Sequence, residues 1–419
     1  MMTQAFYTGI SALKSNQTAI DVISDNLANV GTNGFRGYSA EFSSLFENAL
    51  HSTSAGSSAN SQTGVGTRVS ATTMNMQNGS AILSEKSTDL AINGDGWFGI
   101  QSSGEPLYTR DGAFSFDAND DLVTNDGFHV LGTMGGNISN DTLTKTLNEI
   151  PLSAAGAQEK LQFPRYLTYP PEPTTNAKFF ANLGLGTETV PVGVGIVDSA
   201  GNKNSLKLEF TKSSTQTPPG SQWDVVATAK SLDGLTTYDT KTGTAEFGEN
   251  GDLLSTTLTT IDNNGTNVTM NLGSGYSGIV TMNGIYKSSS SIADGTIGGN
   301  LEGYSINQNG EVIAAFTNGK QSSVGKIAVY HFQNDQGLDR VTGTKFSKSS
   351  NSGDAIFFKD AAGNDSVGAS IMNYKLEGSN VQMSTGLTDL IIHQKAYDAS
   401  SKCVTTADQM IQKALSMHK

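Results

Sequence analysis

The first pattern that could carry chemistry is a glycine-rich stretch at residues 94–99, GDGWFG, which has the G-x-G-x-x-G spacing of dinucleotide-binding loops. A dinucleotide loop needs a helix after the glycines, because the helix N-terminus meets the pyrophosphate. Residues 100–112, IQSSGEPLYTRDG, instead predict strand and turn. We therefore assign these glycines to turns and expect no nucleotide cofactor.

A second candidate is a calcium loop that begins at Asp117, because residues 117–121 (DANDD) open like an EF-hand. The sixth position is Leu122 rather than Gly, and the twelfth is Phe128 rather than Glu. Without the sharp turn and the bidentate carboxylate, a hairpin tip is the better interpretation. The histidines also lack H-x-x-x-H spacing, and none stands in a ligand pattern beside Cys403. We expect no metal site.

Hydrolytic chemistry is the third possibility. No nucleophile elbow supports a Ser/His/Asp triad, although side chains assembled in space could still form one. Acidic pairs on a glycine-rich β-scaffold could imitate a glycosidase, but the acids cluster at turns and the chain has only 2 Trp to stack on sugars. We predict that the protein is not an enzyme and has no catalytic residues. A secreted β-rich adhesin or glycosidase remains the alternative from another class.

The composition of the chain disfavours several kinds of partner and structural feature. The 419 residues carry a formal net charge of −13 without a cluster of Lys or Arg, which disfavours nucleic acid as a partner. The single cysteine, Cys403, excludes an intrachain disulfide, and we expect it to be a buried or half-buried apolar residue. No apolar run approaches the roughly 20 residues that span a bilayer. The N-terminus also lacks the features of a cleavable signal peptide.

The two ends of the chain differ from everything between them. Each shows apolar residues at alternating steps of three and four, the spacing of a helical heptad seam, with polar residues at a few positions. A two-stranded coiled coil between the chain's own ends accounts for both stripes. The residues predicted to pack subunit helices together are Phe6, Ile10, Leu13, Ile20, Leu27, Leu387, Leu390, Tyr397, Val404, Ile411 and Leu415.

Between these ends the period changes to two, and Asn-Gly and Asp-Gly turn signals recur at short intervals. We predict a mixed α and β fold, with a terminal helical coiled coil and two nested, mainly antiparallel β-domains. Proline-rich sequence from Phe163 and Ser/Gly-rich sequence from Ser288 mark the inner boundaries. The predicted parts are a helical domain at 1–30 and 376–419, an extended linker at 31–72, which includes the low-complexity stretch 52–61, an inner β-domain at 73–145 and 300–375, and an inserted outer β-domain at 146–299.

Three long stretches resemble the flagellar rod, hook and hook-associated axial proteins. They are SDNLANVGTNGFR at 24–36, STDLAINGDGWFGIQSSGEPLYTRDGAFSFDANDDLVTNDGFHVLG at 87–132, and EGSNVQMSTGLTDLIIHQKAYDASSKCVTTADQMIQKAL at 377–415. They occur in the family's order and at its places in the chain. The motif residues that the resemblance singles out are Asn26, Leu27, Ala28, Asn29, Thr32, Gly34, Phe35, Gly94, Gly96, Phe98, Tyr108, Arg110, Gly112, Ser379, Asn380, Val381, Gln394 and Tyr397.

Two further stretches distinguish hook subunits from the other axial proteins. The central segments VDSAGNKNSLKLEFTK, QWDVVATAK and AEFGENGDLL, and residues 301–354 with their NQNG turn, are similar to hook subunits. The alternative within the family is a distal rod or other axial protein. Departures from the family include Lys402 and Cys403 in the last helix, and Gly378 and Gly386, which would fray or kink it if they lie within it.

The resemblance implies a structural subunit of the bacterial flagellar hook, a curved helical polymer that acts as a universal joint and transmits torque from rod to filament in motility. It implies that the chain is secreted through the flagellar type III export apparatus, without a cleavable signal peptide, and lies outside the cell. The expected partners are further copies of the chain, the distal rod protein, the hook cap protein and the hook–filament junction proteins. Nucleic acid and membrane insertion are not expected.

Overall fold

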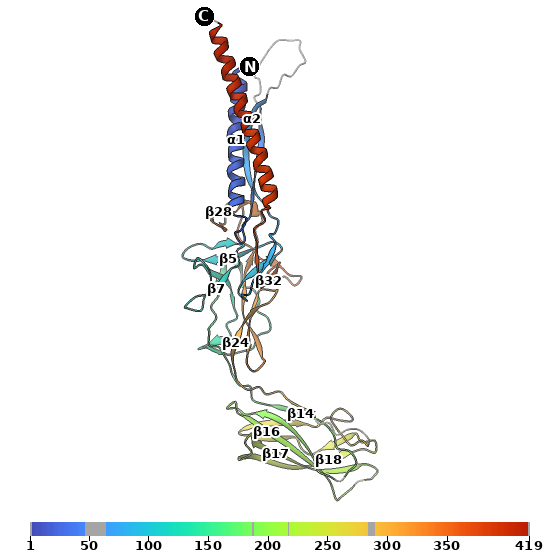
Figure 1. Cartoon of the computed structure of the whole chain (residues 1–419). Coiled ribbons are helices and arrows are strands. Elements are labelled where there is room, and N and C mark those ends of the chain that lie inside the picture. The colour runs from blue at the N-terminus through green and yellow to red at the C-terminus, as the bar shows by residue number, and fades with distance from the viewer. Residues whose placement is uncertain (1, 47–63, 187, 217, 284–289, 418–419) are drawn as a thin grey trace.

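The computed structural model describes residues 2–46, 64–186, 188–216, 218–283 and 290–417 as an elongated molecule with three parts in a row (Figure 1). A pair of helices forms one end, an inner β-domain the middle and an outer β-domain the other end. Both chain termini lie at the helical end, so each β-domain is inserted into the part before it. This arrangement confirms the predicted mixed α and β fold with terminal helices. The stretch 52–61 lies outside the described residues.

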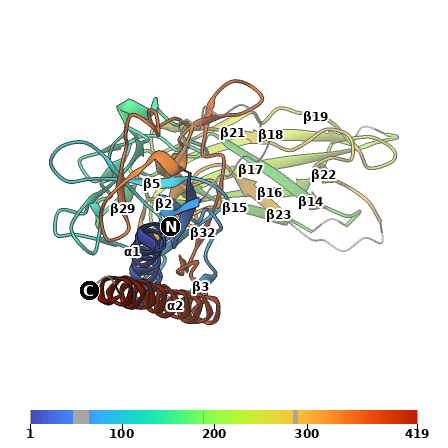
Figure 2. The same ribbon diagram turned by 90° about the horizontal axis from the view of Figure 1, so that it is seen from above.

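The helical end consists of α1 (Met2–Ala28) and α2 (Met383–Ser416). The helices are antiparallel, since Gly9 near the start of α1 meets Val404 late in α2, while Leu27 meets Gly386. Figure 2, seen from above, shows α1 beside α2, with α2 inclined to the view. Gly378 precedes α2, so only Gly386 interrupts the helix.

The segment after α1 is not the extended linker that the sequence predicted. Strands β1 (Tyr38–Phe46) and β2 (Gly64–Met74) pair as an antiparallel ribbon that lies along α1. Ser15 Oγ on α1 donates to the carbonyl of Thr67 at 3.0 Å, and Gly66 packs against Ser11. The sequence did not predict this pairing, because the ribbon packs on α1 through hydroxyl groups and its strands therefore lack a clear apolar face.

The inner domain is built around a 15-stranded sheet whose path runs β10-β11-β13-β24-β25-β26-β9-β5-β6-β29-β28. Its pairings are antiparallel except for β11 with β13. Two short ribbons, β3 with β33 and β32 with β4, complete it on the side of α2. The strands are β3 (Ala81–Leu83), β4 (Leu90–Asn93), β5 (Trp97–Gln101), β6 (Leu107–Thr109), β7 (Phe114–Phe116), β8 (Leu122–Thr124), β9 (His129–Met134), β10 (Ile138–Ser139), β11 (Thr142–Leu143), β12 (Glu159–Lys160), β13 (Thr168–Tyr169), β24 (Gly299–Ile306), β25 (Glu311–Phe316), β26 (Gln321–Ile327), β27 (Val329–Tyr330), β28 (Asp339–Thr342), β29 (Lys345–Ser347), β30 (Phe358–Lys359), β31 (Asp365–Ser366), β32 (Ser370–Asn373) and β33 (Lys375–Glu377).

The outer domain has its own core between two sheets, ordered β15-β16-β17-β18-β19 and β20-β21-β14-β22, with β23 also pairing with β14. Strand β16 alternates buried and exposed residues, as a strand with one face on a core must. Trp223, Phe210 and Phe179 fill the space between the sheets. The strands are β14 (Asn176–Asn182), β15 (Val190–Val197), β16 (Lys203–Lys212), β17 (Ser221–Ser231), β18 (Thr237–Phe247), β19 (Leu253–Thr256), β20 (Thr260–Asn263), β21 (Thr266–Asn271), β22 (Ile279–Val280) and β23 (Ser290–Ala293).

The boundary between the two β-domains differs from the predicted 146–299. Leu152, Leu161 and Phe163 are buried in the inner core, and β13 pairs with β24 of the inner sheet. The chain crosses at a neck where Glu172 and Thr296 form a bridge. The outer domain therefore spans about 174–294. The proline-rich stretch 163–173 ends at this neck, so it marks the true edge, and the predicted start at 146 lay too far toward the N-terminus.

Candidate assembly surface and its junction with the inner domain

The face of α2 that meets α1 is made largely of small and polar side chains. A Cβ added at Gly9 would lie 2.6 Å from Val404 Cγ2, so the two helices approach closely there. His393 Nδ1 and Asn16 Oδ1 are 3.0 Å apart, and Ala407 is the buried residue of α2. Contact between small residues allows close approach but buries little apolar area.

Large apolar side chains of α2 remain exposed on its other faces. Leu387, Ile391 and Leu415 are 44%, 56% and 68% exposed, and Tyr397 is exposed as well. The predicted heptad seam is therefore only partly the contact between the chain's own ends: Leu390, Val404 and Ile411 are half-buried, whereas Leu387, Tyr397 and Leu415 face solvent. The helix carries more apolar surface than one partner covers, so a single-partner seam could not account for it.

Helix α1 is better covered because it lies between α2 and the β1–β2 ribbon. Phe6, Leu13, Ile20 and Leu27 are half-buried, and Ile10 is exposed. The helical end of a single chain thus leaves an apolar surface open, mainly on α2, and we call these outward residues of α2 the assembly surface. They are Leu387, Ile391, Ile392, Tyr397, Met410 and Leu415.

Beneath the helices, the three sequence motifs meet at one junction. Asn26 on α1 exchanges hydrogen bonds with the backbone of Tyr38, at 2.9 and 2.6 Å. Asn380, just before α2, accepts from the Gly37 N–H and donates to the carbonyls of Asn75 and Gln77. Each amide side chain therefore fixes backbone groups of other segments, which sets the position of the helices on the inner domain.

Gly34 shows why this junction tolerates little change. Its φ is +67°, and a Cβ there would lie 2.4 Å from the backbone N of Asp111. Its own N–H donates to the carbonyl of Glu377 at 2.7 Å. A side chain at this position would push the first and second motifs apart.

A buried charged triad lies at the centre of the junction, and each motif supplies one member. Glu377 pairs with Arg36 at 3.0 Å and with Arg110 at 3.2 Å, and all three side chains are at most 3% exposed. Arg36 also donates to the carbonyls of Met76 and Gln77, and Arg110 to that of Gly94 at 2.9 Å.

The electrostatics of the triad follow from its burial. Desolvation lowers the pKa of Arg36 to about 10, with the Arg110 charge adding to it and Glu377 opposing it. Burial lowers the pKa of Arg110 as well, again opposed by Glu377. Both groups stay charged at neutral pH, so removing the carboxylate would leave two cations without their partner. Sequence reasoning missed Arg36 and Glu377 as site residues, although both stand within the quoted motifs as charges among Gly and Asn.

Most of the remaining motif residues pack the inner core or line the junction. Gly96, Phe98, Tyr108 and Gly112 pack the inner core, and Phe35, Gly94, Ser379 and Val381 line the junction. Asn29 and Thr32 bond each other where the chain leaves α1, and Leu27 meets Gly386. Ala28, Gln394 and Tyr397 are exposed and belong to neither group.

The structure also places the other motifs that the sequence singled out. Gly94 and Gly96 have φ of +116° and +129° in a turn, and β5 rather than a helix follows them. Residues 117–121 form the tip between β7 and β8. Cys403 is exposed, contrary to the expectation that it would be buried or half-buried, because little of α2 is covered within one chain. Among the described residues, no cluster of three or more His, Cys, Asp or Glu could hold a metal, and no helix is long and apolar enough to cross a membrane.

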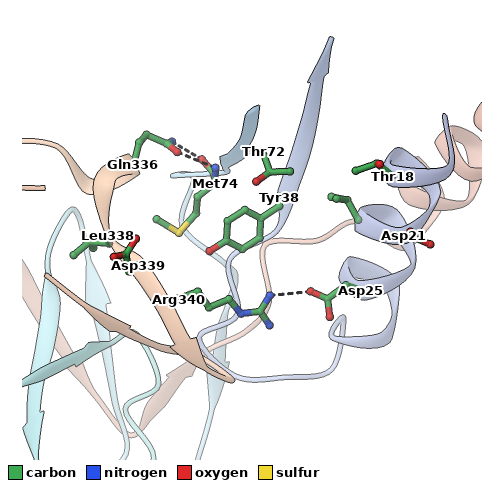
Figure 3. Close-up of a pocket in the computed structure, with 11 residues that line it drawn as sticks. Thr18, Asp21, Asp25, Tyr38, Thr72, Met74, Gln336, Leu338, Asp339 and Arg340 are labelled. Carbon is green, nitrogen blue, oxygen red and sulfur yellow. Dashed lines mark hydrogen bonds and ion pairs between the residues drawn. The ribbon is translucent and has the colours of Figure 1, made fainter. Parts of the chain in front are cut away.

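A cleft opens beside the junction, between α1, the base of the ribbon and the segment before β28 (Figure 3). Arg340 Nη1 pairs with Asp25 at 2.8 Å and lies over the rings of Phe35 and Tyr38. The Gln336 side chain bonds the N–H and carbonyl of Met74, at 2.8 and 2.6 Å. Burial raises the pKa of Tyr38, against the opposing effect of Arg340. These contacts brace the helical end against the inner domain.

Sequence models of four protein families match successive parts of the chain. Residues 6–36 match "Flagella basal body rod protein" and 91–157 match "Flagellar hook protein FlgE/F/G D1 domain". Residues 172–352 match "Flagellar basal body protein FlaE D2 domain", and 372–417 match "Flagellar basal body rod FlgEFG protein C-terminal".

Similar proteins agree with these matches along nearly the whole chain. The flagellar hook protein FlgE of Borreliella burgdorferi is 28% identical over 448 residues, covering 98% of both chains. That of Escherichia coli is 27% identical over 424 residues, covering 97% of this chain and 98% of the relative. The crystal structure of Helicobacter pylori flagellar hook protein FlgE2 is similar in fold, with a TM-score of 0.53 and 18% identity, over 71% of this chain and 100% of that one.

Proposed function

This chain belongs to the flagellar hook protein family, and we propose that it is the structural subunit of a flagellar hook, which polymerises through its helical end. The observation that carries the proposal is the assembly surface. A single chain leaves large apolar side chains such as Leu387 and Leu415 exposed on a long helix, although both β-domains close their own cores. Apolar surface of this kind is characteristic of a face that other chains cover.

The order of parts along the molecule suits a tube wall with a division of labour. Helical ends with apolar faces can pack permanently around a central channel. The outer domain presents many Ser, Thr and Asn side chains, which form wet contacts that exchange with little cost. A hook must resist twisting yet bend as it turns, and we infer that the helical end supplies the first property and the outer domain the second.

We propose the remaining partners from the family resemblance. They are the distal rod protein, the hook cap protein, the hook–filament junction proteins and the flagellar type III export apparatus, which would carry the chain out of the cell without a cleavable signal peptide. The chain would act as a structural component and not as an enzyme.

The test is to replace the chromosomal copy in the source bacterium with the unmodified chain or a variant, and to image the structures that the cells then form. We expect curved tubes, and we expect none from Leu13→Asp, which places a charge in the half-buried helix contact. Gln17→Asp, on the exposed face of α1, is the matched control and should leave the tubes intact. Straight, unbending tubes would assign the chain to the rod, and a secreted monomer that never assembles would overturn the proposal.

A further inference from the structure

Ribbon β3–β33 is an unusual surface feature of the inner domain. All three residues of β3 are exposed, with Ile82 at 50% and Leu83 at 80%. Within the described part of the chain, β3 pairs only with β33, so its other edge is open. Exposed edge strands with apolar side chains are sites where another chain associates.

The ribbon is held rigidly, which favours a docking role over a loose end. Glu377 at the end of β33 belongs to the buried triad, and its Oε1 also accepts from the Gly79 N–H at 3.0 Å. Next to β33, Tyr374 has φ of +55° and is exposed, and its carbonyl accepts from the Ser84 N–H at 2.8 Å. A bulky residue in this backbone conformation is strained, and such strain is found at sites with a function.

The cleft beside α1 has a volume of about 520 Å³ and is complementary to the ribbon in charge. Asp21, Asp25 and Asp339 lie on it, and only Asp25 has an ion-pair partner among the described residues, Arg340. Three carboxylates against one guanidinium leave an excess of two negative charges. Val22, Met74 and Leu338 supply an apolar lining. Figure 3 shows Met74 and Leu338 on the side of the cleft that faces Asp25.

The charge of the ribbon has the opposite sign. Lys375 stands across from Leu83 in the strand pair, and Lys86 follows three residues after Leu83. Neither lysine has an ion-pair partner among the described residues, and the exposed Glu85 offsets one of the two charges. Glu377, the other charged residue of β33, is buried and neutralised by the two arginines of the triad, so it adds nothing to the exposed charge. The ribbon thus combines an exposed apolar pair with an excess of one positive charge, and the cleft combines an apolar lining with two negative charges.

We propose that the β3–β33 ribbon of one copy docks into the cleft beside α1 of a second copy. The two surfaces lie on different sides of the molecule, since Figure 2 shows β3 beside α2 and away from β29, the partner of β28. A contact between two different surfaces is heterologous and therefore repeats from copy to copy, which gives a helical polymer when it does not close. The inference rests on the proposed function. It adds a contact between the inner domain of one copy and, in the next copy, the cleft that holds the Arg340–Asp25 ion pair.

Cysteine cross-linking in assembled tubes tests the docking directly. In a Cys403→Ser background, Leu83→Cys is combined with Asp339→Cys, and both positions are exposed. Oxidation of tubes should give a ladder of covalent multimers. Monomer should give none, and neither should the control pair of Leu83→Cys with Glu105→Cys, which lies in an exposed loop outside the cleft. Tubes that form normally but give no ladder would overturn the docking and leave the hook assignment standing, whereas an unmodified chain that never forms tubes would overturn the hook assignment itself.

Charge reversal decides the question if the cysteine pair impairs assembly. Asp339→Lys or Lys375→Glu alone should raise the critical concentration for assembly roughly fivefold, and the two together should return it toward that of the unmodified chain. Effects that simply multiply in the double variant would contradict the contact. Leu83→Asp should raise the critical concentration roughly tenfold or more while leaving the melting temperature of the monomer unchanged, because the Leu83 side chain is largely in solvent within one chain.

Discussion

The helical end and the outer domain differ in how far one chain buries their large apolar side chains. The outer domain closes two sheets on a core that includes Trp223, Phe210 and Phe247, and this core forms within one chain although Leu235 and Leu254 stay exposed at the domain surface. Helix α2 is 34 residues long, has one buried residue, and keeps large apolar side chains in solvent. A domain whose core closes within one chain can adjust its position in an assembly, whereas a long helix with a single buried residue is covered by its neighbours.

The largest expected effect is the loss of assembly when the helical end is changed. Leu390→Asp should abolish tubes, because a charge in the half-buried contact of α2 costs several kcal/mol in every subunit. Both β-domains should keep their unfolding temperatures, measured by calorimetry on the monomer. Asp389→Ala serves as the neighbouring control and should still assemble. Normal tubes from Leu390→Asp would remove the basis for the comparison.

Removal of the outer domain should have a different result. If a short Gly/Ser linker replaces residues 174–294, just inside the bridge between Glu172 and Thr296, the inner core and both helices stay intact. We expect tubes of unchanged inner radius that are straight or irregular, since the outer contacts that set curvature are gone. Electron microscopy measures this outcome. If no tubes form although the shortened subunit is found outside the cell, the outer domain holds the lattice together.

A third expectation concerns the buried triad that joins helices to inner domain. Glu377→Gln should destabilise the inner domain by about 3–5 kcal/mol, because it leaves two buried guanidinium groups without their carboxylate. The outer domain supplies the matched control in Glu209→Gln, whose partner Lys207 lies 2.7 Å away in solvent. That change should cost at most about 1 kcal/mol. Denaturant unfolding of both variants compares the two, and equal losses would contradict the structural role of the triad.

The smallest expected effect is a difference in acid sensitivity between the β-domains. Burial lowers the pKa of His331 in the inner domain, against a hydrogen bond to the carbonyl of Val367. The unfolded chain then binds the proton more readily, so this contribution to stability is full above about pH 6.5 and is lost as the pH falls below it. His331→Gln should remove that dependence.

In the outer domain, burial alone would raise the pKa of Asp294, but hydrogen bonds from Thr175 and Asn176 outweigh it and hold the pKa at about 2. Hydrogen bonds from Asn264 and Asn202 likewise lower the pKa of Asp198 against its burial. Both contributions are present above about pH 4 and are lost as the pH falls, that of Asp294 as the pH approaches about 2. Acid titration followed by Trp97 and Trp223 fluorescence should therefore disturb the inner domain first. Simultaneous loss would show that the domains are coupled.

Local sequence was sufficient for the elements whose pattern is set by neighbours in the chain. The 3.6-residue period of α1 and α2, the alternation in β16, and the turns at Gly94 and Gly96 were all predictable from the residues. The three motifs likewise indicated the family by their residues and order alone. In each case the information lies within a few residues, because helix, strand and turn geometry depend on local backbone and side-chain preferences.

Only the tertiary structure decided which face of a helix meets which partner. The heptad stripe of α2 predicted that Val404, Leu387 and Leu415 all pack in the seam, but only Val404 meets α1, at Gly9, while Leu387 and Leu415 are exposed. The ribbon β1–β2 occupies another side of α1. The triad of Arg36, Arg110 and Glu377 joins residues as many as 341 positions apart, a span given by 377 minus 36. Sequence determined the helices, strands and family, whereas burial and charge pairing depend on contacts between distant segments, which no local pattern encodes.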